Sequence, residues 1–228
     1  VEPYNIRLGA YLLYRATRWF PEGSIHLAVV DPGVGGPRKP LIVEAEKGVL
    51  IGPDNGLLIP AAKRLGLKKV YSINAEGDFL PKRFTEAFHG RDIFAPTAAL
   101  LAKGAKPAEL GVEVSSYVEA AFPEAKLLED KILGEIIHVD RFGNLVTNIE
   151  MEMVKALGVE VGSKLEILIG EKPVRVKLVK AYAEVPVGEA LAIPGSGGTL
   201  EISVNQDDAL KVLGAKIGDR VEVKPYRF

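Results

Sequence analysis

Several residue types and patterns are scarce in this sequence of 228 residues. It has no cysteine, which excludes disulfides, thiolate zinc sites and cysteine nucleophiles. No stretch approaches eighteen uncharged apolar residues, and the first residues, from Val1 to Asn5, lack the basic start and apolar run of a signal peptide. We therefore expect a soluble, cytoplasmic protein with no membrane partner.

The sequence also lacks an excess of positive or negative charge. The 29 Lys and Arg residues nearly balance the 30 Asp and Glu residues, for a formal net charge of −1. A free-standing nucleic-acid binder needs a basic surface of some size, so nucleic acid is not the expected partner. One Gln and six Asn beside abundant Lys, Glu and Arg are typical of proteins from hot environments, so we expect a thermophile.

The first part of the chain alternates expected helices and strands. An amphipathic helix is predicted over residues 6–20 and further helices over 56–65 and 91–103. Strands are predicted over residues 24–30, 41–46, 48–52 and 69–73. This alternation predicts an N-terminal α/β layer domain with a mostly parallel sheet, over residues 1–127.

The second part of the chain has a different pattern, with short alternating runs of apolar and polar residues separated by turn signals. Strands are predicted over residues 134–139, 164–169, 174–179, 190–193, 199–204 and 220–223. Closely spaced hairpins favour a small antiparallel, barrel-like β domain, which we place at residues 131–228.

Polar chemistry gathers in loops that follow apolar runs. The segment from Asp31 to Arg38 puts a carboxylate at the expected carboxyl end of a strand, then glycines, then an arginine. A tight turn with an exposed Asp–Arg pair is an equal alternative. In the next loop, Asp54 or Asn55 either faces the same crevice or caps the following helix.

His89 stands immediately before an apolar helix. The positive end of a helix dipole favours the neutral imidazole, which can accept a proton as a general base must. A metal site made of Asp31, Asp54, Asp92 and His89 is the competing interpretation, although no metal-ligand spacing supports it. His26 and His138 lie inside apolar strand patterns and are interpreted as structural side chains.

A last polar loop runs from Asp140 to Asn148. Its carboxylate, aromatic ring and amides suit a small polar ligand with a flat ring, whereas Asn and Gly also suit an ordinary hairpin.

Taken together, these loops resemble the adenosine-forming S-adenosylmethionine hydrolases, or hydroxide adenosyltransferases, which are related to the fluorinases and chlorinases. The matching segments occur in the family's order and span nearly the whole chain. They are Val30-Asp31-Pro32-Gly33-Val34-Gly35 with Arg38, Gly52-Pro53-Asp54-Asn55-Gly56, Phe88-His89-Gly90-Arg91-Asp92-Ile93-Phe94-Ala95-Pro96, Asp140-Arg141-Phe142-Gly143-Asn144 with Thr147-Asn148-Ile149, and Pro194-Gly195-Ser196 with Leu200-Glu201-Ile202 and Asn205.

The resemblance implies hydrolysis of S-adenosyl-L-methionine to adenosine and L-methionine, with no cofactor and no metal. It also implies a homotrimer whose sites lie between the N-terminal domain of one subunit and the C-terminal domain of the next. Asp31, Arg38 and His89 would be the catalytic residues. The substrate-binding residues would be Tyr4, Asp140, Phe142, Asn144 and Ser196.

The chemistry requires one water aimed at the ribose C5′, because the sulfonium is already a good leaving group. Arg38 can hold Asp31 ionised, and either Asp31 or His89 accepts the proton of the water. The alternatives are 5′-halogenation, which Asp31 and Val34 disfavour, a metal-dependent hydrolase using Asp54, Asp92 and His89, and a non-catalytic nucleoside-binding protein. Family members begin with a strand and loop carrying Thr-Asp-Phe-Gly, which has no match before Tyr4, so we expect an exposed sheet edge.

Overall fold

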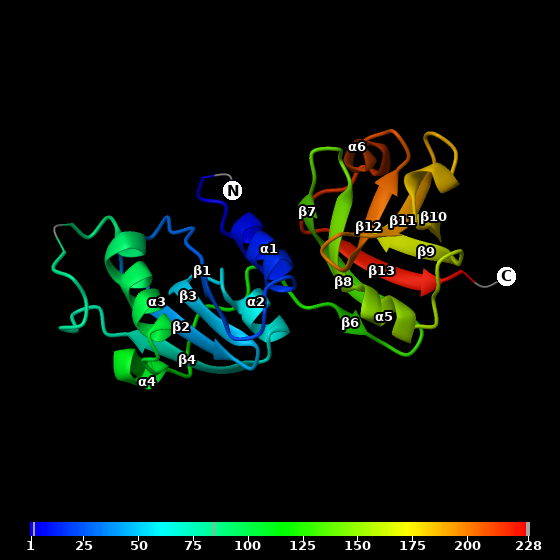
Figure 1. Cartoon of the computed structure of the whole chain (residues 1–228). Coiled ribbons are helices and arrows are strands. Elements are labelled where there is room, and N and C mark those ends of the chain that lie inside the picture. Colours follow the sequence, from blue (N-terminus) through cyan, green and yellow to red (C-terminus); the bar gives the residue numbers. More distant parts are fainter. Residues whose placement is uncertain (2, 84, 227–228) are drawn as a thin grey trace. The chain divides into compact units, whose positions relative to one another are not determined.

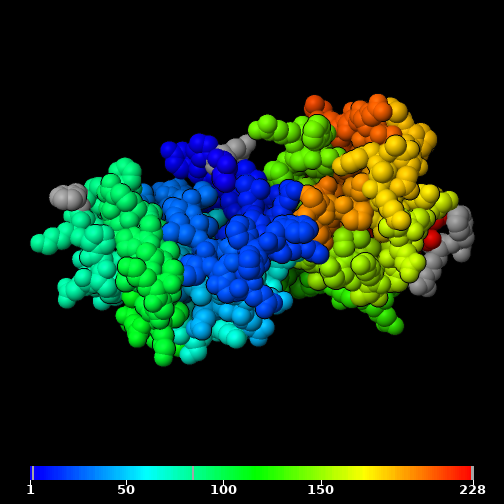
Figure 2. Space-filling model, viewed as in Figure 1, coloured from blue at the N-terminus to red at the C-terminus, as the bar shows by residue number. Residues whose placement is uncertain are grey.

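A computed structural model describes residues 1, 3–83 and 85–226 and divides the chain into two compact units, Val1–Phe122 and Pro123–Phe228. Figure 1 shows helices packed with a sheet in the first unit and a ring of strands in the second. Figure 2 shows the same view with the atoms drawn as spheres and coloured along the sequence. An α/β part followed by a β part confirms the predicted fold class.

The first unit has one five-stranded sheet with the strand order β1-β3-β2-β4-β5. Its elements are α1 (Ile6–Thr17), β1 (Ser24–Leu27), β2 (Pro40–Ala45), β3 (Gly48–Pro53), α2 (Ile59–Arg64), β4 (Leu67–Ile73), the π-helical turn η1 (Gly90–Phe94), α3 (Ala95–Ala102), α4 (Pro107–Leu110) and β5 (Gly111–Glu113). Among the described residues β1 lies at one end of this sheet.

The prediction of a mostly parallel sheet was wrong. Only β1 and β3 pair in parallel within the described sheet, while β2 pairs antiparallel with both β3 and β4, and β4 with β5. Only two residues, Glu46 and Lys47, separate β2 from β3. A parallel pair needs a crossover of roughly a dozen residues, so this connection can only form a hairpin.

Helix α1 begins at a side-chain cap and packs closely against the segments that follow β1 and β3. The Oδ1 atom of Asn5 accepts a hydrogen bond from the Leu8 backbone N–H at 2.9 Å. A Cβ atom at Gly9 would lie 2.8 Å from Val30 and 2.9 Å from Leu57. The helix therefore lies directly against the segment that follows β1, where the first polar loop begins.

The second unit is a closed barrel of seven strands. The order β13-β9-β10-β11-β12-β8-β7 closes through the pairing of β13 with β7, and β6 lies outside the ring against β7. Its elements are β6 (Lys126–Leu127), β7 (Ile132–Val139), β8 (Leu145–Glu150), α5 (Met151–Ala156), β9 (Lys164–Ile169), β10 (Lys172–Leu178), η2 (Tyr182–Glu184), β11 (Ala190–Pro194), β12 (Thr199–Val204), α6 (Ala209–Leu213) and β13 (Arg220–Pro225).

The barrel interior is apolar, with Ile136, Ile167, Leu200 and Val223 fully buried. Strand β10 pairs in parallel with β11, and the other pairs of the ring are antiparallel. The predicted antiparallel, barrel-like domain is thus confirmed, with one parallel pair. Closing the ring removes the free strand edges through which β-sheets associate nonspecifically.

Among the described residues no helix combines the length and the apolar character needed to cross a membrane.

Candidate active site

The first polar loop starts where the chain leaves β1 and is fastened there by Asn55. The side-chain Nδ2 of Asn55 donates to the Val30 carbonyl at 2.8 Å, and its Oδ1 accepts from the Leu57 N–H at 3.2 Å. Asn55 therefore ties the residue before Asp31 to the loop that follows β3. The alternative in which Asp54 or Asn55 caps the following helix is wrong, because α2 begins later, after Leu58, without a side-chain cap.

Asp31, Arg38 and His89 lie in direct contact. The Arg38 Nε donates to Asp31 Oδ1 at 3.0 Å, and the Arg38 Nη2 donates to Asp31 Oδ2. The same Nη2 lies 2.8 Å from Nδ1 of His89. Arg38 therefore bridges the carboxylate and the imidazole, two groups that are 58 positions apart in the sequence.

Burial holds this cluster in a defined geometry. The side chains of Arg38 and Asp31 are only 10% and 5% exposed, and His89 is buried as well. The Arg38 guanidinium also lies 5.4 Å from the ring centroid of Phe94, on the turn that follows His89. An exposed Asp–Arg pair, the alternative interpretation of this loop, is not what the structure shows.

A π-helical turn carries the chain from His89 into the apolar helix. The Ala95 N–H bonds to the Gly90 carbonyl, five residues back, instead of closing a regular α-helical turn. Pro96 follows at once; it has no N–H to donate to the Asp92 carbonyl, and its ring crowds that carbonyl. The helix predicted over residues 91–103 is therefore a wide turn, η1, followed by α3, and such wide turns are frequent at functional sites.

The residues of the alternative metal site are engaged separately. Asp54 Oδ1 accepts from the Val118 N–H at 2.7 Å, and the Asp92 carboxylate accepts from Arg91 at 2.6 and 2.9 Å. Hydrogen bonding by Arg91 is the largest cause that holds the pKa of Asp92 below its usual range. Within the described part of the chain, no group of three or more His, Asp or Glu residues is placed to hold a metal ion.

The second unit brings Asp140 and Asn144 together in the loop between β7 and β8. Asp140 Oδ1 accepts from the backbone N–H groups of Phe142 and Asn144 at 2.8 and 3.0 Å, and its Oδ2 accepts from the Asn144 side chain at 2.9 Å. Asn144 Nδ2 also lies 3.3 Å from the hydroxyl of Tyr182. Burial is the largest cause that raises the pKa of Tyr182, so its phenol stays protonated at neutral pH.

The other predicted binding residues are two exposed aromatic residues and one serine in a turn. Phe142 is 79% exposed on the Asp140 loop, and Tyr4 is 78% exposed before α1. Ser196 lies in the turn between β11 and β12. Because Leu145 pairs with Ile202 and Glu150 with Thr199, that turn is at the opposite end of β8 from the Asp140 loop.

Sequence reasoning missed two residues that contact the predicted ones. Glu86 Oε2 lies 3.3 Å from Nε2 of His89, and Tyr182 contacts Asn144 as described. A Glu three residues before the candidate His89 was a local signal for the first contact. Nothing in the sequence linked Tyr182 to the Asp140 loop, because η2 comes 38 residues after Asn144.

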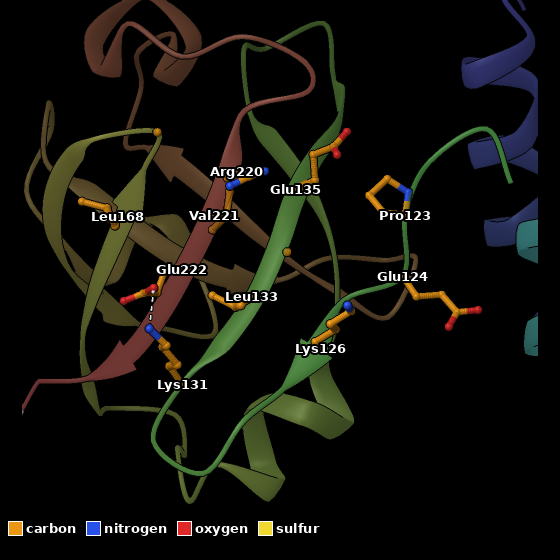
Figure 3. Close-up of a pocket in the computed structure, with 12 residues that line it drawn as sticks. Pro123, Glu124, Lys126, Lys131, Leu133, Glu135, Leu168, Arg220, Val221 and Glu222 are labelled. Carbon is orange, nitrogen blue, oxygen red and sulfur yellow. Dashed lines mark hydrogen bonds and ion pairs between the residues drawn. The ribbon is translucent and has the colours of Figure 1, made fainter.

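A surface groove on the barrel contains none of the predicted residues. It has a volume of about 640 Å³ and lies over β7, β13 and β9, with the ion pair of Lys131 and Glu222 at 3.0 Å (Figure 3). Its charged side chains are of both signs, among them Lys126, Glu135 and Arg220. We do not assign it to the candidate active site.

The fold and the Asp–Arg–His cluster define a two-part chain with a polar site in its α/β unit, and comparison with known proteins identifies the family. The SAM hydroxide adenosyltransferase N-terminal domain matches residues 1–111 and the C-terminal domain matches residues 134–222. The chain therefore belongs to the SAM hydroxide adenosyltransferase family, as the sequence motifs predicted.

Individual relatives agree with this assignment. The chain is 37% identical to the (R)-S-adenosyl-L-methionine hydrolase of Salinispora tropica over 98% of its own length and 83% of that protein. It is 36% identical to an uncharacterized conserved protein from Thermotoga maritima whose crystal structure it matches with a TM-score of 0.84, over 98% of this chain and 86% of that one. The fluorinase of Nocardia brasiliensis is 26% identical over 98% of this chain and 84% of that protein, which confirms the predicted relation at a lower level.

Proposed function

We propose that this protein hydrolyses S-adenosyl-L-methionine to adenosine and L-methionine. The observation that carries the proposal is the contact of Asp31, Arg38 and His89, which come from two loops and form a buried polar cluster in a member of this family. Relatives named as hydrolases of this substrate support it over nearly the full chain.

The reaction is an in-line displacement at the ribose C5′. The oxygen of a water molecule forms a bond to C5′ while the bond from C5′ to sulfur breaks. The electron pair of the broken bond stays on the sulfur of methionine. One proton of the water passes to Asp31 or His89 and then to solvent. Arg38 keeps both groups in place, and no metal or organic cofactor is needed because the sulfonium leaves as a neutral thioether.

Tyr4, Asp140, Phe142, Asn144 and Ser196 bind the substrate in this proposal. Asp140 takes the methionine ammonium and Phe142 packs near the adenine. The large exposure of Phe142 and Tyr4 supports such a role, because aromatic side chains in open positions are available to a ligand or to a neighbouring subunit. Ser196 contacts the amino-acid end.

The active assembly is a homotrimer with each site between the N-terminal domain of one subunit and the C-terminal domain of the next. The location of the two groups of predicted residues in separate compact units supports a shared site. Cytoplasmic localisation stays a prediction from the sequence.

Product analysis tests the function. The protein is incubated with S-adenosylmethionine, with and without chloride and with and without EDTA, and the nucleosides are separated by chromatography. Adenosine in every condition is expected. A chlorinated nucleoside would support halogenation, and loss of activity with EDTA would support a metal-dependent hydrolase, so either result would overturn the proposal.

A further inference from the structure

His89 is held between two partners of opposite charge. Its Nδ1 lies 2.8 Å from Nη2 of Arg38, and its Nε2 lies 3.3 Å from Oε2 of Glu86. Both ring nitrogens therefore have a protein partner, and each partner permits one role only.

The chemistry of these partners fixes the tautomer of the ring. A guanidinium nitrogen has hydrogens to donate and no lone pair to offer, so Nδ1 of His89 must be the acceptor. A carboxylate only accepts, so Nε2 must carry the hydrogen. The two contacts agree on a single neutral form, protonated at Nε2.

Glu86 is itself held by a second arginine. Arg83 Nε donates to Glu86 Oε1 at 3.3 Å, and the remaining nitrogens of Arg83 donate to the Ala75 carbonyl and to Glu76. The Arg83 side chain is only 13% exposed, so its position is well defined and it holds the more exposed Glu86 side chain in place. Hydrogen bonding from His89 is the largest cause that lowers the pKa of Glu86, and Arg83 adds to it.

The glycine-rich loop packs against the same residue. Gly35 has a φ of +75°, and a Cβ atom there would lie 3.2 Å from the Glu86 carbonyl oxygen. The loop that carries Asp31 and Arg38 thus lies next to the segment that carries Glu86, and His89 contacts both.

We infer that Glu86 is a positioning residue that orients His89, so that Nδ1 accepts from Arg38 and Arg38 in turn holds Asp31. This inference rests on the proposed function, because its kinetic effect is defined only if the cluster catalyses hydrolysis. Glu86 does not touch the reacting atoms; it acts through the imidazole.

Charged side chains from three segments surround His89. They are Arg38 and Asp31 from the glycine-rich loop, Glu86 and Arg83 from the segment before His89, and Asp92 from η1. A proton on Nδ1 would break the contact with Arg38, because both atoms would then be donors. The Glu86 carboxylate accepts the hydrogen of Nε2 and so favours the ring form whose Nδ1 accepts from Arg38.

The test compares Glu86→Ala and Glu86→Gln with Glu76→Gln, a matched control that alters another carboxylate on Arg83 without touching His89. We expect Glu86→Ala to lower kcat about tenfold with little change in KM. Glu86→Gln keeps an acceptor for Nε2 and restores most of kcat. Glu76→Gln behaves as the unmodified protein.

A spectroscopic readout separates this inference from the function itself. The chain has three histidines, so ¹⁵N labelling of histidine gives a simple spectrum in which His89 is assigned with a His89→Gln variant. We expect a protonated Nε2 and an unprotonated Nδ1, whether or not the protein hydrolyses S-adenosylmethionine. A protonated Nδ1, or a kcat of Glu86→Ala that matches the Glu76→Gln control, would overturn the inference.

Discussion

At the scale of single residues, the contacts distinguish the two candidates for the proton acceptor. The one lone pair of neutral His89 is directed to Arg38, whereas each oxygen of the Asp31 carboxylate accepts one hydrogen bond from Arg38 and keeps further capacity. We therefore expect Asp31 to accept the proton of the attacking water, and His89 to hold Arg38.

Three variants test this assignment of the proton acceptor. Asp31→Asn and His89→Ala each lower kcat/KM by on the order of a hundredfold or more, because the first removes the acceptor and the second releases Arg38. His89→Gln retains more activity than either, because its amide oxygen can still accept from Arg38. Steady-state kinetics with S-adenosylmethionine measure the three. Equal losses in His89→Gln and Asp31→Asn would contradict the assignment of the acceptor.

Among the structural elements, the Asp140 loop depends on one glycine. Gly143 has a φ of +84°, and a Cβ atom there would lie 2.2 Å from Asp208 Oδ1, at the start of α6. Gly143→Ala should lower the free energy of unfolding by more than about 1 kcal/mol, since both the backbone and the side-chain contact oppose it. Gly162→Ala is the control, because Gly162 has a φ of +98° with nothing within 4 Å of the added atom. Thermal unfolding of both variants measures the difference, and equal losses would show that contact with Asp208 does not matter.

Protonation of His26, in strand β1, links the stability of the fold to pH. Burial lowers the pKa of His26, whose ring packs edge-on against Phe20 at a centroid distance of 5.3 Å. Above about pH 6.5 the ring is neutral in the folded and the unfolded chain. As the pH falls, the unfolded chain binds the proton first, so the free energy of unfolding decreases.

His26→Gln removes this linkage. Denaturant titrations at a series of pH values from 7 to about 5 should show a smaller loss of stability for His26→Gln than for the unmodified protein. An unchanged slope of stability against pH would show that His26 does not take part.

The elements also show where sequence patterns succeed and fail. The alternating runs of the barrel were predicted nearly to the residue at β9 and β12, whereas β8, Leu145–Glu150, was interpreted as part of a loop. The Asn and Gly residues of this segment favour a turn, but Thr147 and Asn148 are buried and donate to the Leu200 and Pro123 carbonyls. Tertiary partners supplied what the local pattern lacked.

At the scale of the whole molecule, the motif order predicted the family and the contact of Asp31, Arg38 and His89. It did not predict Glu86, whose role depends on the orientation of one imidazole ring and on a neighbouring arginine. The motifs also did not predict the strand directions in the first sheet. These directions are set by the lengths of connections such as the two residues between β2 and β3.

The proposed trimer makes a prediction about mass. Sedimentation equilibrium should give three times the chain mass of 24.6 kDa at concentrations where the protein is active. A monomer with full activity would contradict a site shared between subunits, because a single chain would then hold every group that the reaction needs.

Isotope labelling shows whether water attacks the ribose C5′ of S-adenosylmethionine. The reaction is run in H₂¹⁸O, with Asp31→Asn as the control, and the products are examined by mass spectrometry. We expect unlabelled methionine and adenosine with one ¹⁸O in its 5′-hydroxyl, formed by the unmodified protein far faster than by the variant. Methylthioadenosine, a halogenated nucleoside, or adenosine without the label would contradict it.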